Sequence, residues 1–88
     1  MTGIEIAQRA KEQLSELTGL KVDTVSGFDR QDKGWHVRVE FIEMKRIPEG
    51  TDLLATYEGV LDDEGNLLNY QRIRRYLRQQ TMAEEVAA

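Results

Sequence analysis

The sequence contains no cysteine, a single proline and a single tryptophan among its 88 residues. The lack of cysteine excludes disulfides and thiolate metal sites, and it is consistent with a reducing compartment. No apolar run reaches the roughly 18 residues that a membrane-spanning helix needs. Charged residues begin at Glu5, before any apolar signal core could form. Together these absences predict a soluble cytoplasmic protein.

Negative charge exceeds positive charge, with a net charge of −4, but the two signs are unevenly placed. The segment "YQRIRRYLRQQ", Tyr70 to Gln80, holds four arginines out of 12 Lys and Arg residues and contains no acid. An acidic chain is a poor general nucleic-acid binder, because such proteins usually present a strong basic field. The local basic segment still leaves a narrower nucleic-acid contact open.

The length fits one domain, which we place at residues 1–80, followed by a frayed tail at residues 81–88. The first element is a helix from Thr2 to Gly19. Thr2 and Glu5 have the spacing of a capping box, and Gly19 can adopt the left-handed conformation that ends a helix. Spacings of three and four predict an apolar stripe that packs on a sheet, formed by Ile4, Ala7, Ala10, Leu14 and Leu17.

Four strands follow the helix. "LKVDTVSGFDRQ" alternates with a slip that a bulge near Ser26 and Gly27 would repair. "WHVRVEFIEMKR" alternates clearly, which places Trp35 with the core residues. Residues 52–61 form a third strand, and "DDEGN" predicts a hairpin into a fourth strand at residues 67–80. The result is an α+β fold, with the N-terminal helix packed on one face of a four-stranded antiparallel meander sheet.

The residues that could carry chemistry give little support for an enzyme. His36 is the only histidine, and nothing in the spacing brings it to Ser15 or Ser26 as a catalytic triad would require. The acidic hairpin residues 62–64 lack the twelve-residue calcium pattern. There is no glycine-rich phosphate loop. We therefore expect no catalytic residue, no bound metal and no cofactor, although a small-ligand pocket between helix and sheet stays open.

The fourth strand carries the strongest functional signal. Strand alternation would place five of its aromatic and basic side chains on one face: Tyr70, Arg72, Arg74, Tyr76 and Arg78. Three interpretations remain open. Cross-strand acids could neutralise the arginines, a partner protein could dock on the strip, or single-stranded RNA could stack on its aromatics. The acidic net charge disfavours the last.

Several motifs together resemble the gas vesicle protein O family, GvpO. They are W-x-V-x-V-E at Trp35 to Glu40, R-I-P at Arg46 to Pro48, D-L-L-A-T-Y-E at Asp52 to Glu58, L-D-x-x-G at Leu61 to Gly65, and Y-x-R-x-x-R-Y-x-R at Tyr70 to Arg78. The dense part of the match covers about half of the chain. The order and spacing of the motifs carry the resemblance, since no single motif is decisive.

The resemblance implies a non-enzymatic accessory protein of gas vesicle formation that contacts shell or other accessory proteins. It brings no catalytic activity, metal or cofactor with it. It favours the docking interpretation of the fourth strand and a cytoplasmic protein that associates with gas vesicles. The alternative is a regulator of gas vesicle production that touches RNA or DNA through the same strip. The oligomeric state does not follow from the resemblance.

Overall fold

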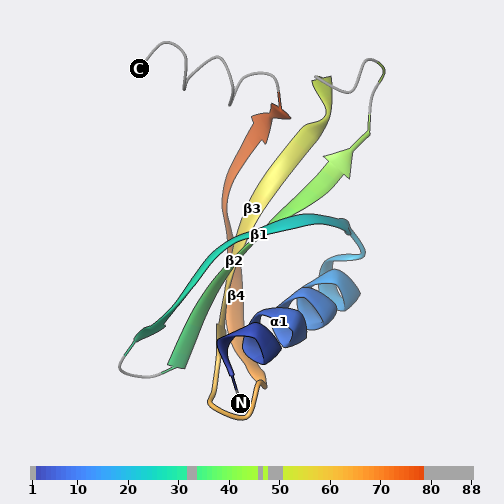
Figure 1. The fold of residues 1–88 in the computed structure, drawn as a ribbon. Helices are drawn as coiled ribbons and strands as arrows, with labels where there is room; N and C mark the ends of the chain where they lie inside the picture. The colour runs from blue at the N-terminus through green and yellow to red at the C-terminus, as the bar shows by residue number, and fades with distance from the viewer. Residues whose placement is uncertain (1, 32–33, 46, 48–50, 79–88) are drawn as a thin grey trace, which may run out of the picture.

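The computed structural model describes residues 2–31, 34–45, 47 and 51–78. Helix α1 (Gly3–Thr18) precedes strands β1 (Lys21–Gln31), β2 (Gly34–Met44), β3 (Leu53–Leu61) and β4 (Leu67–Leu77) (Figure 1). The strands pair antiparallel in the order β1-β2-β3-β4. The predicted α+β fold, a helix on a four-stranded meander, is confirmed. The predicted tail at 81–88, Arg46 and most of the R-I-P turn lie outside the described residues.

Helix α1 begins and ends where the sequence predicts. The Thr2 hydroxyl accepts a hydrogen bond from the Glu5 amide at 3.2 Å, and the Glu5 carboxylate accepts one from the Thr2 amide at 3.0 Å. Gly19 has φ 72° and its amide donates to the Ser15 carbonyl at 2.8 Å. Because these groups satisfy the first amides and last carbonyls locally, both helix ends are defined by the sequence itself.

The buried stripe of α1 differs from the predicted one. The fully buried residues are Ile6, Ala10 and Leu14, whereas Ile4 is 79% exposed and Leu17 is 59% exposed. The predicted stripe is therefore correct at its centre and wrong at both ends. Ile6, Ala10 and Leu14 lie four residues apart, on one side of the helix. The helix has two overlapping sets of apolar residues. The orientation of the helix on the sheet decides which set is buried, and the helical period alone does not determine this orientation.

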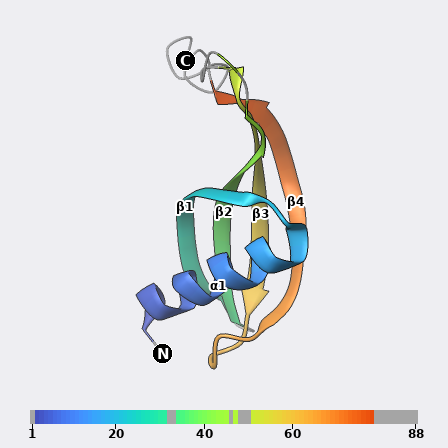
Figure 2. The same cartoon turned by 90° about the vertical axis from the view of Figure 1, so that its right-hand side faces the viewer.

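The helix crosses one face of the sheet, with its N-terminal end near β1 and its C-terminal end near β4 (Figure 2). Beneath it, inward-facing residues of β2 and β3 complete the core: Val37, Val39, Phe41 and Leu61. Trp35 is partly buried and packs against this core, as predicted. Gly59 lets the helix approach closely, because a Cβ there would lie 3.3 Å from the Leu14 Cδ1 atom. Buried side chains thus fill the space between the helix and strands β2 and β3.

Bulges in β1 and a tight hairpin between β3 and β4 shape the sheet. A register shift between Val25 and Gly27 confirms the predicted bulge in β1, and a second shift lies between Val22 and Thr24. The hairpin from β3 to β4 turns at Gly65, which has φ 84°. The Gly65 carbonyl accepts a hydrogen bond from Gln13 Nε2 at 2.8 Å. The helix therefore holds this hairpin through polar contacts as well as through the core.

Candidate functional site on strand β4

Strand β4 forms one edge of the sheet, and most of its surface is exposed. All eight residues from 68 to 75 are exposed, including Tyr70 at 42% and Ile73 at 45%. An edge strand also presents one row of unpaired backbone groups to the solvent. Of the four strands, β4 therefore offers the longest run of accessible side chains in the described part of the chain.

A bulge in β4 between Arg72 and Arg74 divides the predicted basic and aromatic strip between the two faces of the sheet. Arg72 pairs with Tyr57, which packs on the helix-side core, and Arg74 pairs with Thr56, the preceding residue of β3. A second register shift, between Val60 and Leu61, lies before the strip begins. An extra residue reverses the alternation of the side chains that follow it. The prediction that one face holds all five residues, Tyr70, Arg72, Arg74, Tyr76 and Arg78, is therefore wrong.

On the face away from the helix, β4 contributes to a buried polar network around Glu40. The Glu40 carboxylate is only 5% exposed and accepts hydrogen bonds from three hydroxyl groups. The donors are Ser26 at 2.6 Å, Thr56 at 2.5 Å and Tyr76 at 2.5 Å. They come from β1, β3 and β4, so this one carboxylate of β2 joins all four strands. Such a network stabilises a buried charge only when its partners are all in place.

Arg74 and Arg78 close over the same face. Arg74 donates from Nε to the Thr56 hydroxyl at 3.1 Å, and its guanidinium lies 4.4 Å from the centre of the Tyr76 ring. Arg78 donates to Asp23 at 3.0 Å and lies 3.7 Å from Asp52. Asp23 belongs to β1 and Arg78 follows β4, so this ion pair joins the two edges of the sheet. These side chains therefore stabilise the fold at this end.

On the helix side, aromatic rings connect the core to the exposed edge. The Phe41 and Tyr57 rings meet edge to face with centroids 5.5 Å apart, and the Tyr70 centroid lies 6.3 Å from that of Tyr57. Phe41 is fully buried, and Tyr70 is 42% exposed. The rings thus form a continuous aromatic path from β2 to β4 that ends on the surface.

Two arginines share one carboxylate beside this path. Arg75 Nε lies 2.9 Å from Glu43 Oε1, and Arg72 Nη1 lies 3.4 Å from Glu43 Oε2. The arginine side chains are about half exposed, at 46% and 50%, and Glu43 is 13% exposed. The local charge is therefore one positive unit in excess. Nothing in the sequence singled out Arg75, because plain alternation placed it on the other face of the strand from Arg74, and Glu43 lies on a different strand.

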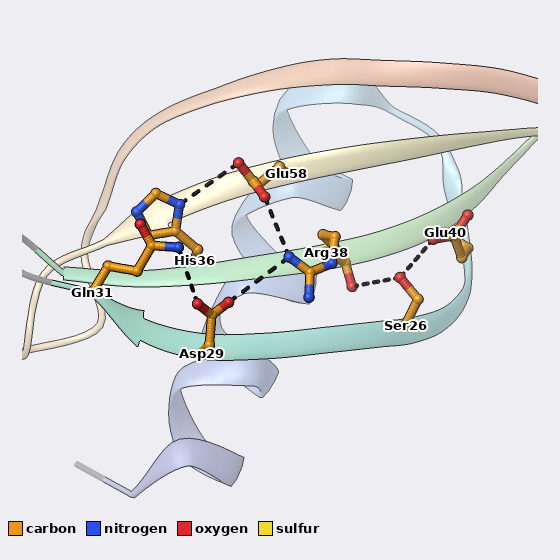
Figure 3. Close-up of polar contacts among 7 residues, drawn as sticks. All are labelled: Ser26, Asp29, Gln31, His36, Arg38, Glu40 and Glu58. Carbon is orange, nitrogen blue, oxygen red and sulfur yellow. Dashed lines mark hydrogen bonds and ion pairs between the residues drawn. The ribbon is translucent and has the colours of Figure 1, made fainter.

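His36 lies in a separate charged cluster on the face away from the helix (Figure 3). Its Nδ1 lies 3.6 Å from Glu58 Oε1, and the other oxygen of Glu58 lies 3.4 Å from Arg38 Nη1. Arg38 Nη1 also lies 3.8 Å from Asp29. The Ser26 hydroxyl points to Glu40 instead of His36, as the same view shows. This geometry is a charge-paired sheet face, not a nucleophile with its base.

Of the acidic hairpin residues, Asp62 is engaged with the backbone, while Asp63 pairs with Arg30 at 3.0 Å. The Asp62 Oδ1 atom accepts hydrogen bonds from the amides of Glu64 and Asn66, both at 2.9 Å. The bond from the Asn66 amide is the main reason why the pKa of Asp62 is lowered from its ordinary value. Among the described residues, no group of three or more His, Asp or Glu side chains could hold a metal ion. Asp62 thus shapes the turn.

The described helix is neither long nor apolar enough to cross a membrane. Within the same part of the chain, every buried side-chain nitrogen and oxygen has a hydrogen-bond partner. The polar groups around Glu40 are therefore satisfied by the protein itself, and they need no ligand.

Comparisons with known proteins agree with the motifs. The family model described as gas vesicle synthesis protein GvpO matches residues 1–82. Gas vesicle protein O of Streptomyces sp. (strain CB03234) is 44% identical over 75 residues, which are 85% of this chain and 59% of the relative. Gas vesicle protein O1 of Halobacterium salinarum is 31% identical over 78 residues, 89% of this chain and 65% of the relative.

A third relative, gas vesicle protein O of Haloferax mediterranei, is 31% identical over 86 residues, 96% of this chain and 61% of the relative. The chain thus spans about three fifths of the length of the curated relatives that it matches. No solved structure matches it. The family model and the three relatives show that this chain belongs to the gas vesicle protein O family, GvpO.

Proposed function

We propose that this protein is a non-enzymatic accessory protein of gas vesicle formation that acts by binding shell proteins or other accessory proteins. Membership of the GvpO family supports the process. The relatives are longer than this chain, so their role in the cell is proposed for this chain and is not taken over from their names. Support for a binding role comes from the exposed edge strand β4, and the described charged clusters are internally paired instead of being arranged for catalysis.

The single observation that carries the proposal is the helix-side surface of β4. We define the β4 docking surface as Tyr70, Arg72 and Arg75. Tyrosine and arginine are enriched where one protein anchors on another, because they bring large contact area and several donors. Tyr70 ends the aromatic path from the core, so its ring is held in place before a partner arrives. The two arginines share only one carboxylate, that of Glu43, and can bind a second carboxylate from a partner.

The other residues of the predicted strip have a supporting role in this proposal. Arg74, Tyr76 and Arg78 hold β4 against the rest of the sheet through Thr56, Glu40 and Asp23. They fix the position of the strand that presents the docking surface. Replacing them would therefore weaken binding mainly by destabilising the fold.

The test is a pull-down from cells that co-express the tagged chain with the gas vesicle shell and accessory proteins of its own source. The variant Arg72→Glu with Arg75→Glu should lose the captured partner. The control variant, Lys21→Glu with Arg30→Glu, makes the same change in net charge on β1 and should keep it. Circular dichroism would verify that both variants fold. Capture that is undiminished in the folded Arg72→Glu, Arg75→Glu variant would refute the β4 docking surface.

The alternative regulator of gas vesicle production receives less support from the charges. Arg72 and Arg75 are paired with Glu43, and Arg78 is paired with Asp23 and Asp52. Arg78 is thus neutralised, and Arg72 and Arg75 together keep a single excess positive charge, which is far from the strong basic field that nucleic-acid binders usually present. Titration with single-stranded RNA at low salt is therefore expected to show no binding. Affinity that falls steeply as salt rises would favour the regulator instead.

A further inference from the structure

A groove runs between helix α1 and strand β1, along the side of the helix that faces this edge of the sheet. It consists of two adjoining hollows of about 330 Å³ and about 270 Å³. The first is lined mainly by Ile4, Ala7, Val25 and Phe28, and Lys11 borders both. We call this feature the α1–β1 groove. The N-terminal half of α1 lies beside the lower part of β1 in Figure 2.

The first hollow is mostly apolar, and two large apolar side chains at its rim are exposed to solvent. Ile4 is 79% exposed and Phe28 is 43% exposed, while Ala7 and Val25 form its partly buried floor against the core. The small side chain of Ala7 leaves room between the two large ones. Phe28 packs closely on the helix start, since a Cβ at Gly3 would lie 2.6 Å from its ring. Clustered exposed apolar side chains around a hollow commonly mark a binding groove.

A cation lies at the junction of the two hollows. Lys11 is half-buried, and among the described residues its side chain makes no hydrogen bond and no ion pair. Its neighbour Glu12 is exposed and borders only the second hollow. The nearby acids of β1 are engaged elsewhere, Asp23 with Arg78 and Asp29 with Arg38. An incoming carboxylate at Lys11 would therefore meet an uncompensated positive charge.

The geometry favours a helix over a strand as the occupant. The outer edge of β1 is interrupted by two register shifts, between Val22 and Thr24 and between Val25 and Gly27. Such bulges disrupt the regular row of backbone groups that an added strand needs. Ile4 and Lys11 are two helical turns apart, which corresponds to about 10.5 Å along the axis. A helix lying alongside α1 can match this separation with residues seven apart.

We propose that the α1–β1 groove binds an amphipathic helix of a second protein. One large apolar side chain of that helix enters the hollow between Ile4 and Phe28. A glutamate or aspartate two turns away pairs with Lys11. This surface lies at the opposite edge of the sheet from the β4 docking surface. The chain can therefore hold two partners at once, which goes beyond the single contact in the proposed function.

The lack of cysteine makes a site-specific crosslinking test direct. The variant Ile4→Cys is purified, labelled with a thiol-reactive benzophenone, mixed with the gas vesicle proteins of its own source and irradiated. We expect a crosslink to one helical segment that carries an acid seven residues from an apolar residue, and mass spectrometry would identify it. The control Glu16→Cys, on α1 but outside the groove, should give no such product. A crosslink only to a second copy of this chain, or none at all, would overturn the proposal.

A binding measurement with the identified segment completes the test. Trp35 is the only tryptophan, and its ring lies 6.2 Å from that of Phe28, so its fluorescence reports on the groove. Lys11→Glu should weaken binding of the synthetic peptide about tenfold. A peptide with lysine in place of its acid should restore it. Lys21→Glu, the control, should bind like the native chain. Equal binding by Lys11→Glu would refute the predicted ion pair.

The two docking surfaces can fail separately. The Arg72→Glu, Arg75→Glu variant changes β4 and leaves the groove intact, so it should keep the Ile4→Cys crosslink. If Ile4→Cys gives no crosslink while the native chain still captures a partner that the Arg72→Glu, Arg75→Glu variant loses, only the groove is disproved. The reverse result would disprove only the β4 docking surface.

Discussion

Replacing Tyr76 with phenylalanine removes one of the three hydroxyl groups that donate to the buried Glu40 carboxylate. A hydrogen bond to a charged group contributes roughly 1.5–3 kcal/mol, so we expect the free energy of unfolding at pH 7 to fall by about 2 kcal/mol. For a domain of this size the free energy of unfolding is on the order of 5–10 kcal/mol, so this loss is a large part of it. The ring itself stays, so the contact with Arg74 should persist.

The same residue predicts how stability depends on alkaline pH. Burial, the hydrogen bond to Glu40 and repulsion from its charge raise the pKa of Tyr76 from 10.0 to about 12. The folded state therefore holds this proton more tightly than the unfolded state. The resulting stability is fully present below pH 10 and is lost as the pH rises from 10 to 12. The full shift corresponds to roughly 2.7 kcal/mol, and solvent screening of this partly buried phenol reduces it to about 1–2 kcal/mol.

The assay is urea unfolding followed by the fluorescence of Trp35, for the native chain and Tyr76→Phe, at pH 7 and in steps from pH 9 to 11.5. The difference in free energy of unfolding should be about 2 kcal/mol at pH 7 and should narrow above pH 10. Tyr70→Phe is the matched control, because no hydrogen bond of the Tyr70 hydroxyl is seen among the described residues. It should change stability by less than about 0.5 kcal/mol. Equal stability of native and Tyr76→Phe proteins at pH 7, or a gap that stays constant to pH 11.5, would refute the reasoning.

The remaining predictions concern the helix and the hairpin, and each is read from the same unfolding curves. Ile6→Ala should lower the free energy of unfolding by about 2–5 kcal/mol, because it empties a fully buried site, whereas Ile4→Ala should cost less than about 0.5 kcal/mol. Equal effects would contradict the observed stripe. Thr2→Ala should cost about 1 kcal/mol by removing the helix cap, and an unchanged midpoint would show that the cap contributes nothing. Gly65→Ala should cost about 1–2 kcal/mol, since its φ of 84° is strained for alanine, and no loss would argue against this turn conformation.

The sequence predicted the elements whose signals are local. The capping box at Thr2 and Glu5, the helix end at Gly19, the slip in apolar pattern that marks the bulge near Ser26, and the turn at Gly65 all show in residues a few positions apart. Alternation in β2 also placed Val37, Val39 and Phe41 in the core correctly. Since each of these features is fixed by neighbouring residues, one sequence is enough to find them.

The candidate site was predicted only in part, and the reason is the bulge in β4 between Arg72 and Arg74. Alternation holds as long as every residue of a strand has one partner, and one unpaired residue reverses it. Nothing in "YQRIRRYLRQQ" marks the extra residue, because the bulge depends on pairing with β3. The sequence therefore identified the strand and its aromatic and basic composition. It did not separate Tyr70 and Arg72 from Arg74 and Tyr76.

The sequence by itself determined the order of the elements, the meander topology and membership of the GvpO family, because these depend on local patterns and on the order of short motifs. Only the tertiary structure decided which partners the charged side chains take. Glu40 accepts hydrogen bonds from hydroxyl groups of three other strands. Glu43 pairs with two arginines of β4, and Arg78 pairs with Asp23 on the opposite edge strand. These contacts join residues up to 55 positions apart, and the twist and register that bring them together arise only when the whole sheet forms.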